Sequence, residues 1–145
     1  MFLDAREVIP EQRKPETHKP IGSRYDEQII VVGSETQALL ADTRAFMVGA
    51  GAIGCEMFKY FAAMGVGTGP KGSVICTDPD IIEKSNLNRQ FLFRAGDVQK
   101  LKSEAAMNAV KAMNPDMSVS AYPHKVFQHL ELLGTAFVCS QQLFI

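Results

Sequence analysis

Hydrophobic residues gather in short runs along the chain, and in one longer stretch they recur at helical spacing. Residues 45–48 are wholly apolar and run into a glycine, a pattern typical of a buried parallel strand. Between residues 52 and 64, apolar side chains return every third or fourth position and Gly65 follows, which predicts a helix with one buried stripe. The expected stripe consists of Ile53, Met57, Phe61 and Met64. Residues 73–78 form a second apolar run, so the pattern predicts a strand–helix–strand unit with parallel strands.

Weaker patterns flank this unit. The apolar run at residues 28–33 is rich in β-branched side chains, which favours a strand, although its length leaves a buried helical turn open. Residues 34–42 are expected to form a helix, with Ser34 as its cap and Gln37 completing a capping box. Residues 118–122 alternate weakly and predict a third strand.

A polar, irregular segment at residues 79–96 precedes one more predicted helix. Ser103 is expected to cap this helix, and Asn114-Pro115 to end it. One face of the helix, which carries Ala106, Val110 and Met113, is expected to be buried.

The last residues, 127–145, predict a short apolar helix followed by an apolar run at 136–139. Taken together, the elements predict an α/β protein: a Rossmann-like parallel sheet with flanking helices, truncated before the sheet is complete.

Composition narrows the class of protein. The chain has 145 residues, of which 46% are hydrophobic and 21% charged, as in a globular domain. A net charge of -1 gives no basic excess for nucleic acid or for a membrane surface, and no apolar run approaches the ~20 residues of a membrane span. Three cysteines without a CxxC pair favour a reducing compartment, cytoplasm or nucleus, and argue against a zinc site.

A glycine-rich turn between the first strand and the long helix is the first candidate site. Gly49 suits a tight turn, Gly51 lets phosphate approach the backbone, and Gly54 lets the helix pack on the strand. The helix start adds N–H groups and a partial positive charge, which favour phosphate. Glycines used only for packing are the alternative.

Two acids follow the second strand. Asp78 ends it, where a dinucleotide-binding fold places the acid that holds the ribose hydroxyls. Asp80 would help to hold a magnesium ion near the phosphates. Either could instead be a solvated loop acid. The glycines and Asp78 fit an NAD-dependent dehydrogenase as well as an ATP-using enzyme.

The polar loop at residues 81–94 distinguishes these two classes. Arg89 in this loop and Lys102 beyond it are cations that would offset the repulsion between a carboxylate and a triphosphate, which is a catalytic role. Asn86 and Gln90 can hold ribose or phosphate oxygens without adding charge. Phe91 and Phe93 are expected to be core residues.

These motifs occur together in one order: the glycine turn, then residues 77–80, 83–94 and 100–103, with 24–26 before them and 113–115 after. The set resembles the active adenylating domain of ubiquitin-activating enzymes over about residues 23–126. The resemblance implies a domain division: a linker or extended arm at 1–23, a partial adenylating domain at 24–126, and a divergent or truncated tail at 127–145.

The resemblance also implies a reaction. ATP with Mg2+ would activate the C-terminal carboxylate of ubiquitin as an acyl-adenylate. A cysteine on another domain would then take the ubiquitin and pass it to a ubiquitin-conjugating enzyme. The glycine turn and Ala52 would lie against the nucleotide, and Asp78 would hold the ribose. Asn86, Arg89 and Lys102 would hold the phosphates.

Three departures from the family pattern suggest that the chain binds nucleotide without completing the reaction. No aspartate follows Asp116, so the family's metal site is incomplete and no metal ligand is assigned. Glu27 stands where related enzymes carry an arginine that reaches the partner's site; a pseudo-symmetric inactive half would supply it. No cysteine occupies the thioester position. A non-catalytic module that pairs with ubiquitin or with that half is one alternative, and an NAD-dependent oxidoreductase domain, which leaves the Arg89 loop unexplained, is the other.

Overall fold

The computed structural model describes residues 15–125 and 142–144. Contacts divide the chain into two units, Met1–Ala38 and Leu39–Ile145. The described part of the first unit holds a single 3-10 turn at Pro15–Thr17, helix α1 at Asp26–Val32 and the start of helix α2, Ser34–Ala41. The second unit holds the sheet and the remaining helices. The predicted domain boundaries at 23/24 and 126/127 stay a prediction.

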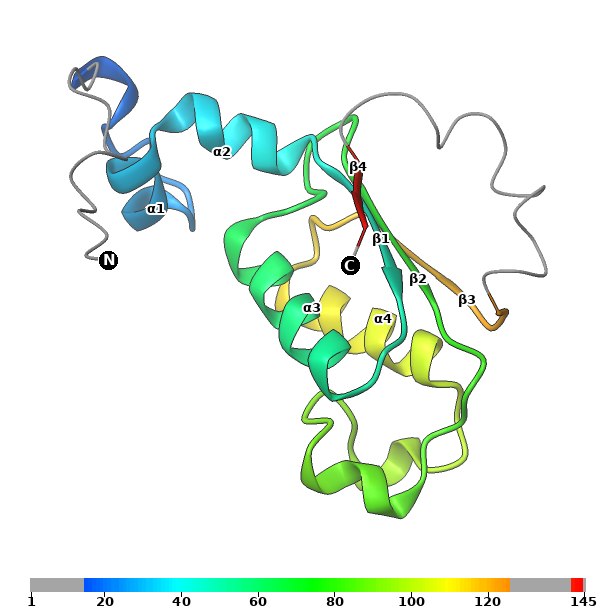
Figure 1. Ribbon diagram of the computed structural model, residues 1–145. Helices are drawn as coiled ribbons and strands as arrows, with labels where there is room; N and C mark the ends of the chain where they lie inside the picture. Colours follow the sequence, from blue (N-terminus) through cyan, green and yellow to red (C-terminus); the bar gives the residue numbers. More distant parts are fainter. Residues whose placement is uncertain (1–14, 126–141, 145) are drawn as a thin grey trace, which may run out of the picture. The chain divides into compact units, whose positions relative to one another are not determined.

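A four-stranded parallel sheet organises the second unit (Figure 1). Its strands are β1 (Arg44–Val48), β2 (Ser73–Thr77), β3 (Val119–Tyr122) and β4 (Gln142–Phe144), in the order β3-β2-β1-β4. The strands expected at residues 45–48, 73–78 and 118–122 are confirmed, and so is the parallel direction. Since β2 and β4 lie on opposite sides of β1, the sheet has the partial Rossmann-like α/β form that the pattern predicted.

Two helices, α3 (Ala52–Met64) and α4 (Lys102–Met113), pack against each other and lie on the same face of the sheet in Figure 1. Phe58 of α3, Val110 of α4 and Val74 of β2 are completely buried in the core between these layers. Gly65 ends α3 in the left-handed conformation, with φ 77°, as the sequence predicted.

The stripe predicted for α3 is wrong in part. The helix buries Gly54, Cys55, Phe58, Phe61 and Ala62, whereas Ile53 is 78% exposed. The reason is local: a Cβ on Gly54 would lie 2.3 Å from the carbonyl oxygen of Gly49, so the helix presses its glycine against the turn. That contact sets which face points inward, and it leaves Ile53 on the open side.

The strand favoured for residues 28–33 is also wrong; the helical alternative holds, because residues 28–32 belong to helix α1 and Gly33 caps it. The carboxylate of Asp26 accepts hydrogen bonds from the backbone N–H groups of Ile21, Gly22 and Ser23 and so fixes the preceding turn. These bonds stabilise the charged form and lower the pKa of Asp26. At the other end Gly33, with φ 87°, returns its N–H to the carbonyl of Ile29.

Both predicted serine caps are replaced by other arrangements. Ser34 is the first residue of α2 rather than its cap, and the side chain of Gln37 accepts a 2.6 Å hydrogen bond from Gln28. Helix α4 begins at Lys102, and Leu101 stands at its cap position, two residues earlier than the expected cap Ser103. The hydroxyl of Ser103 instead donates to the carbonyl of Asp78 at 3.1 Å.

Of the remaining predictions about buried residues and loops, some are confirmed and others are corrected. Ala106 and Val110 are buried as expected, but Met113 is 37% exposed. Phe93 is buried, whereas Phe91 is only partly buried. The segment predicted to be irregular at residues 79–96 holds the 3-10 helix Lys84–Asn88 and the start of a second, Ala95–Asp97. The helix and apolar run predicted within 127–141 lie outside the described residues. Within the described residues, no helix has the length and apolarity to span a membrane.

Candidate functional site

The glycine turn joins β1 to α3 at the carboxyl end of the sheet. Gly49 adopts φ 99°, which side chains disfavour, and its N–H donates to the carbonyl of Thr77 at 2.8 Å. Helix α3 starts after Gly51 without a side chain capping it. The N–H groups of its first turn therefore donate to no capping side chain and can donate to a bound anion.

Gly51 and Gly54 have different roles. Gly54 is required by the fold, since a Cβ there would meet the backbone of Gly49. A Cβ on Gly51 would meet no protein atom within 4 Å. The missing side chain leaves open space on the hollow that Gly51 lines with Val48, Ala52 and Ile53. The turn is thus shaped to receive a group that approaches the backbone closely.

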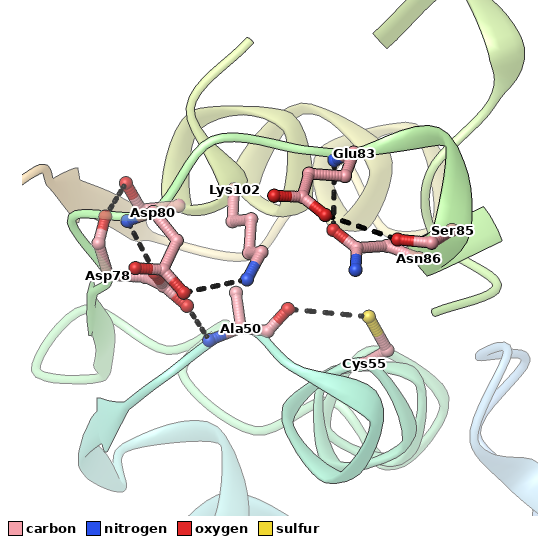
Figure 2. Close-up of polar contacts among 9 residues, drawn as sticks. Ala50, Cys55, Asp78, Asp80, Glu83, Ser85, Asn86 and Lys102 are labelled. Carbon is pink, nitrogen blue, oxygen red and sulfur yellow. Dashed lines mark hydrogen bonds and ion pairs between the residues drawn. The ribbon is translucent and has the colours of Figure 1, made fainter. Parts of the chain in front are cut away.

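Asp78 ties three segments together at this edge. It is 6% exposed, and its Oδ2 accepts the N–H of Ala50 at 2.7 Å. Its Oδ1 accepts the N–H of Asp80 at 2.9 Å, and its carbonyl accepts the hydroxyl of Ser103. Figure 2 shows the carboxylate between the glycine turn and the loop that carries Asp80. Each carboxylate oxygen can still accept a second hydrogen bond, for example from a ribose hydroxyl.

A neighbouring hollow is lined by Lys102, the only cation among the described residues around it. Its side chain is 11% exposed, and its Nζ lies 2.8 Å from Oδ2 of Asp80, whose side chain is 65% exposed. The backbone supports the pair, because the N–H of Lys102 donates to the carbonyl of Asp80 at 2.9 Å. Glu83, Asn86 and Ile81 complete the lining of this hollow.

Asn86 presents donors to that hollow because a capping box fixes its side chain. Its Oδ1 accepts the N–H of Glu83 at 2.9 Å, while the side chain of Glu83 accepts the N–H of Asn86. With the oxygen so engaged, the amide nitrogen is the group that faces away from Glu83 (Figure 2). Asn86 and Lys102 therefore offer N–H donors to anionic oxygens in one place.

Three hollows run along this edge and share residues. The first, at the glycine turn, shares Val48 and Gly49 with a second that Asp78 and Asp80 line. The second shares Asp80 with the third, which holds Asn86 and Lys102. The structure thus brings Gly49, Gly51, Ala52, Gly54, Asp78, Asp80, Asn86 and Lys102 to one edge of the sheet.

His124 and Lys125 also line the second hollow, and the sequence analysis missed them. A signal was available: both follow β3, and the carboxyl ends of parallel strands meet at the same edge of a sheet.

Two predicted site residues lie away from these hollows. Arg89 is exposed, and its guanidinium folds back to the carbonyl of Ser85 at 2.9 Å and to Oδ1 of Asn88 at 3.2 Å. Gln90 is 4% exposed, and its Oε1 has no hydrogen-bond partner among the described residues. The phosphate-binding roles of Arg89 and Gln90 stay predictions.

Two of the three cysteines are described, and both are buried. Burial raises the pKa of Cys76 to about 12 and also raises the pKa of Cys55, whose thiol points to the carbonyl of Ala50. These thiols are protonated at neutral pH and are poor nucleophiles. Among the described residues, no cluster of three His, Cys, Asp or Glu side chains is arranged to hold a metal ion.

Comparison with known proteins assigns the chain to a family. Residues 25–137 match the profile of the ThiF family, which is most of the chain. The chain belongs to the ThiF family. The resemblance inferred from the motifs is confirmed, since curated relatives that the chain matches are named as ubiquitin-activating and ubiquitin-like modifier-activating enzymes.

Three relatives show the extent of the match. The chain is 57% identical over 128 residues to ubiquitin-like modifier-activating enzyme 1 of Dictyostelium discoideum, which covers 86% of this chain and 13% of the relative. It is 54% identical over 129 residues to ubiquitin-activating enzyme E1 1 of Schizosaccharomyces pombe, covering 86% and 13%. To the human ubiquitin-like modifier-activating enzyme 1 it is 49% identical, and the match covers 87% of this chain and 12% of the human enzyme. This ThiF-family chain therefore spans only 12% to 13% of these relatives.

Solved structures share the fold. The chain superposes on Escherichia coli MccB in a structure with AMPCPP and MccA, with TM-score 0.68 and 26% identity over 89% of this chain and 44% of MccB. A second MccB structure with MccA gives TM-score 0.70 and 27% identity, covering 82% and 35%. E. coli tRNA N6-threonylcarbamoyladenosine dehydratase with ATP gives TM-score 0.64 at 24% identity over 71% of this chain and 40% of that one, which is a likeness of fold.

Proposed function

We propose that this chain is the nucleotide-binding part of a ubiquitin-activating enzyme, which uses ATP to adenylate the C-terminus of ubiquitin. The observation that carries the proposal is the hollow in which Lys102 and Asn86 offer N–H donors, next to Asp78 and the glycine turn. An NAD-binding domain has no need of a phosphate-directed cation and amide beyond the acid. The high identity to ubiquitin-activating enzymes supports the same choice.

In this proposal ATP extends along the edge of the sheet. Asp78 accepts hydrogen bonds from the ribose hydroxyls in the second hollow. The open backbone at Gly51, with the start of α3, and the donors of Asn86 and Lys102 bind the triphosphate. Arg89 reaches the phosphates by turning away from Ser85, which its exposed position permits.

The chemistry then requires few groups from this chain. A carboxylate oxygen of ubiquitin bonds to the α-phosphorus, the bond to the bridging oxygen breaks, and pyrophosphate leaves with that electron pair. Lys102 and Arg89 reduce the repulsion between the carboxylate and the triphosphate, and they stabilise charge on the phosphoryl oxygens in the transition state. Magnesium would neutralise phosphate charge. The acids at the third hollow that could help to hold it are Asp80 and Glu83.

The later steps are assigned to other parts of the enzyme. Since the chain spans 12% to 13% of its relatives, and since buried Cys55 and Cys76 are poor nucleophiles, thioester formation belongs to a cysteine on another domain. A pseudo-symmetric inactive adenylating half and the contact with a ubiquitin-conjugating enzyme also lie outside it. By this proposal the isolated chain binds nucleotide and does not form ubiquitin thioester.

Calorimetric titration of the purified chain tests nucleotide binding. ATP with magnesium is expected to bind, and NAD is not. Lys102→Ala should weaken ATP binding about 10- to 100-fold, because a hydrogen bond to a charged group contributes ~1.5–3 kcal/mol. Arg89→Ala should weaken it to a smaller degree. Lys111→Ala, which removes an exposed cation from the last turn of the same helix, is the matched control and should leave affinity unchanged.

The outcomes separate the parts of the proposal. Equal or tighter binding of NAD would favour an oxidoreductase and overturn the assignment. Binding of ATP that Lys102→Ala does not alter would remove Lys102 from the phosphate site. Ubiquitin-dependent exchange between ATP and pyrophosphate by this chain alone would contradict only its proposed incompleteness.

A further inference from the structure

Lys102 and Asp80 form an ion pair in which the lysine side chain is nearly buried and the aspartate side chain is exposed. The side chain of Lys102 is 11% exposed, so its stem is held among buried neighbours at the start of α4. The side chain of Asp80 is 65% exposed, although its backbone is anchored at both its N–H and its carbonyl. The carboxylate can therefore rotate into water at little cost, whereas the ammonium cannot leave the hollow.

The pair lies where the proposed triphosphate must bind. Asp80 and Lys102 line the third hollow together with Asn86 and Glu83, and Asp80 also lines the second hollow beside Asp78. Oδ2 of Asp80 lies 2.8 Å from Nζ of Lys102 and occupies one of the positions from which a phosphate oxygen would accept a hydrogen bond. A phosphate oxygen bound to the same ammonium would lie close to this carboxylate, and the two anions would repel each other.

We infer that Asp80 is the resting counter-ion of Lys102, which holds the ammonium in position until a nucleotide phosphate displaces the carboxylate. The inference rests on the proposed function, because it assigns a regulatory partner to the same phosphate site. A cation of low exposure needs a neighbouring anion. Asp80 supplies that anion without nucleotide, and the triphosphate supplies it afterwards. Nucleotide binding must then overcome the Asp80–Lys102 attraction.

The test is calorimetric binding of ATP, ADP, AMP and adenosine to the full chain in EDTA, so that no metal-bound carboxylate contributes. Asp80→Asn removes the competing charge and should tighten ATP binding about two- to fivefold, the range expected for a partly exposed ion pair. The gain should fall from ATP to AMP and vanish for adenosine, which has no phosphate to place at Lys102. Asp80→Glu keeps the charge and should not show this gain.

A second control isolates the pair from net charge. Glu104→Gln removes one exposed negative charge from the first turn of α4, and none of the described contacts joins Glu104 to Lys102. This variant should not change ATP affinity. Thermal melting without nucleotide shows whether each variant is folded, and Asp80→Ala repeats the test with a second side chain.

Each result bears on a separate claim. Tighter ATP binding by Asp80→Asn but not by Glu104→Gln supports the counter-ion exchange. Unchanged or weaker ATP binding by Asp80→Asn, with the unmodified chain binding ATP, overturns the exchange and leaves the proposed function standing. A similar gain for adenosine and ATP also overturns it. If neither the unmodified chain nor Asp80→Asn binds ATP more tightly than adenosine, both the proposed phosphate site and the counter-ion exchange are wrong.

Discussion

The backbone N–H of Ala50 donates a 2.7 Å hydrogen bond to Oδ2 of Asp78, so the acid that ends β2 holds the glycine turn that follows β1. The second oxygen of the same carboxylate holds the N–H of Asp80. Asp78 is thus a candidate nucleotide-binding residue that also holds two loops together through hydrogen bonds. The loss of its charge should affect both the stability of the fold and the binding site.

Asp78→Asn tests this double role. The amide offers one acceptor to two backbone N–H groups and turns a donor toward one of them, so a buried donor loses its partner. The expected cost is about 1–3 kcal/mol in the free energy of unfolding. Urea unfolding measures that cost, and calorimetry should show weaker ATP binding. Asp116→Asn, at an exposed acid, should alter neither. Unchanged stability of Asp78→Asn would contradict the structural tie.

Alanine at the two glycines of the turn should separate folding from binding. Gly54→Ala places a Cβ 2.3 Å from the carbonyl oxygen of Gly49 and should destabilise the chain by about 1–3 kcal/mol through overpacking. Gly51→Ala meets no protein atom within 4 Å, so it should leave the urea midpoint nearly unchanged and weaken ATP binding. A stable Gly51→Ala variant with full ATP affinity would show that phosphate does not approach the backbone there.

Asn114 should be important for stability because it joins the two helices. It is completely buried, and its amide donates at 2.8 Å to the carbonyl of Ala62, near the end of α3, where helix carbonyls lack intrahelical partners. Asn114→Ala should lower the free energy of unfolding by about 1–3 kcal/mol in urea titrations. Asn108→Ala, at an exposed position of α4, should cost far less. Equal effects would mean that the bond contributes little.

The buried cysteines should resist alkylation in the native protein. The pKa of Cys76 is raised to about 12 and that of Cys55 is raised as well, so both thiols remain protonated well above neutral pH. Iodoacetamide at pH 8, followed by peptide mass spectrometry, should leave both unlabelled in buffer and label both in concentrated urea. Rapid native labelling of Cys55 would indicate a reactive thiol and reopen the question of a thioester on this chain.

The sequence by itself determined the features that depend on neighbours along the chain. The apolar run before Gly49, the helical spacing up to Gly65 and the acid after residues 73–77 predicted β1, α3 and β2 in their correct places. These signals are strong because a buried parallel strand needs a continuous apolar run, and because a glycine turn needs conformations that other residues disfavour.

Only the tertiary structure decided which partners the side chains have. Helical spacing does not show that Gly54 presses on Gly49 and thereby exposes Ile53, or that Ser103 bonds to Asp78 instead of capping α4. The pairing of Lys102 with Asp80, and the hollow that His124 lines together with Asp78, likewise join segments that are distant in sequence. Such contacts depend on how the helices and loops pack over the sheet, and no local pattern records that packing.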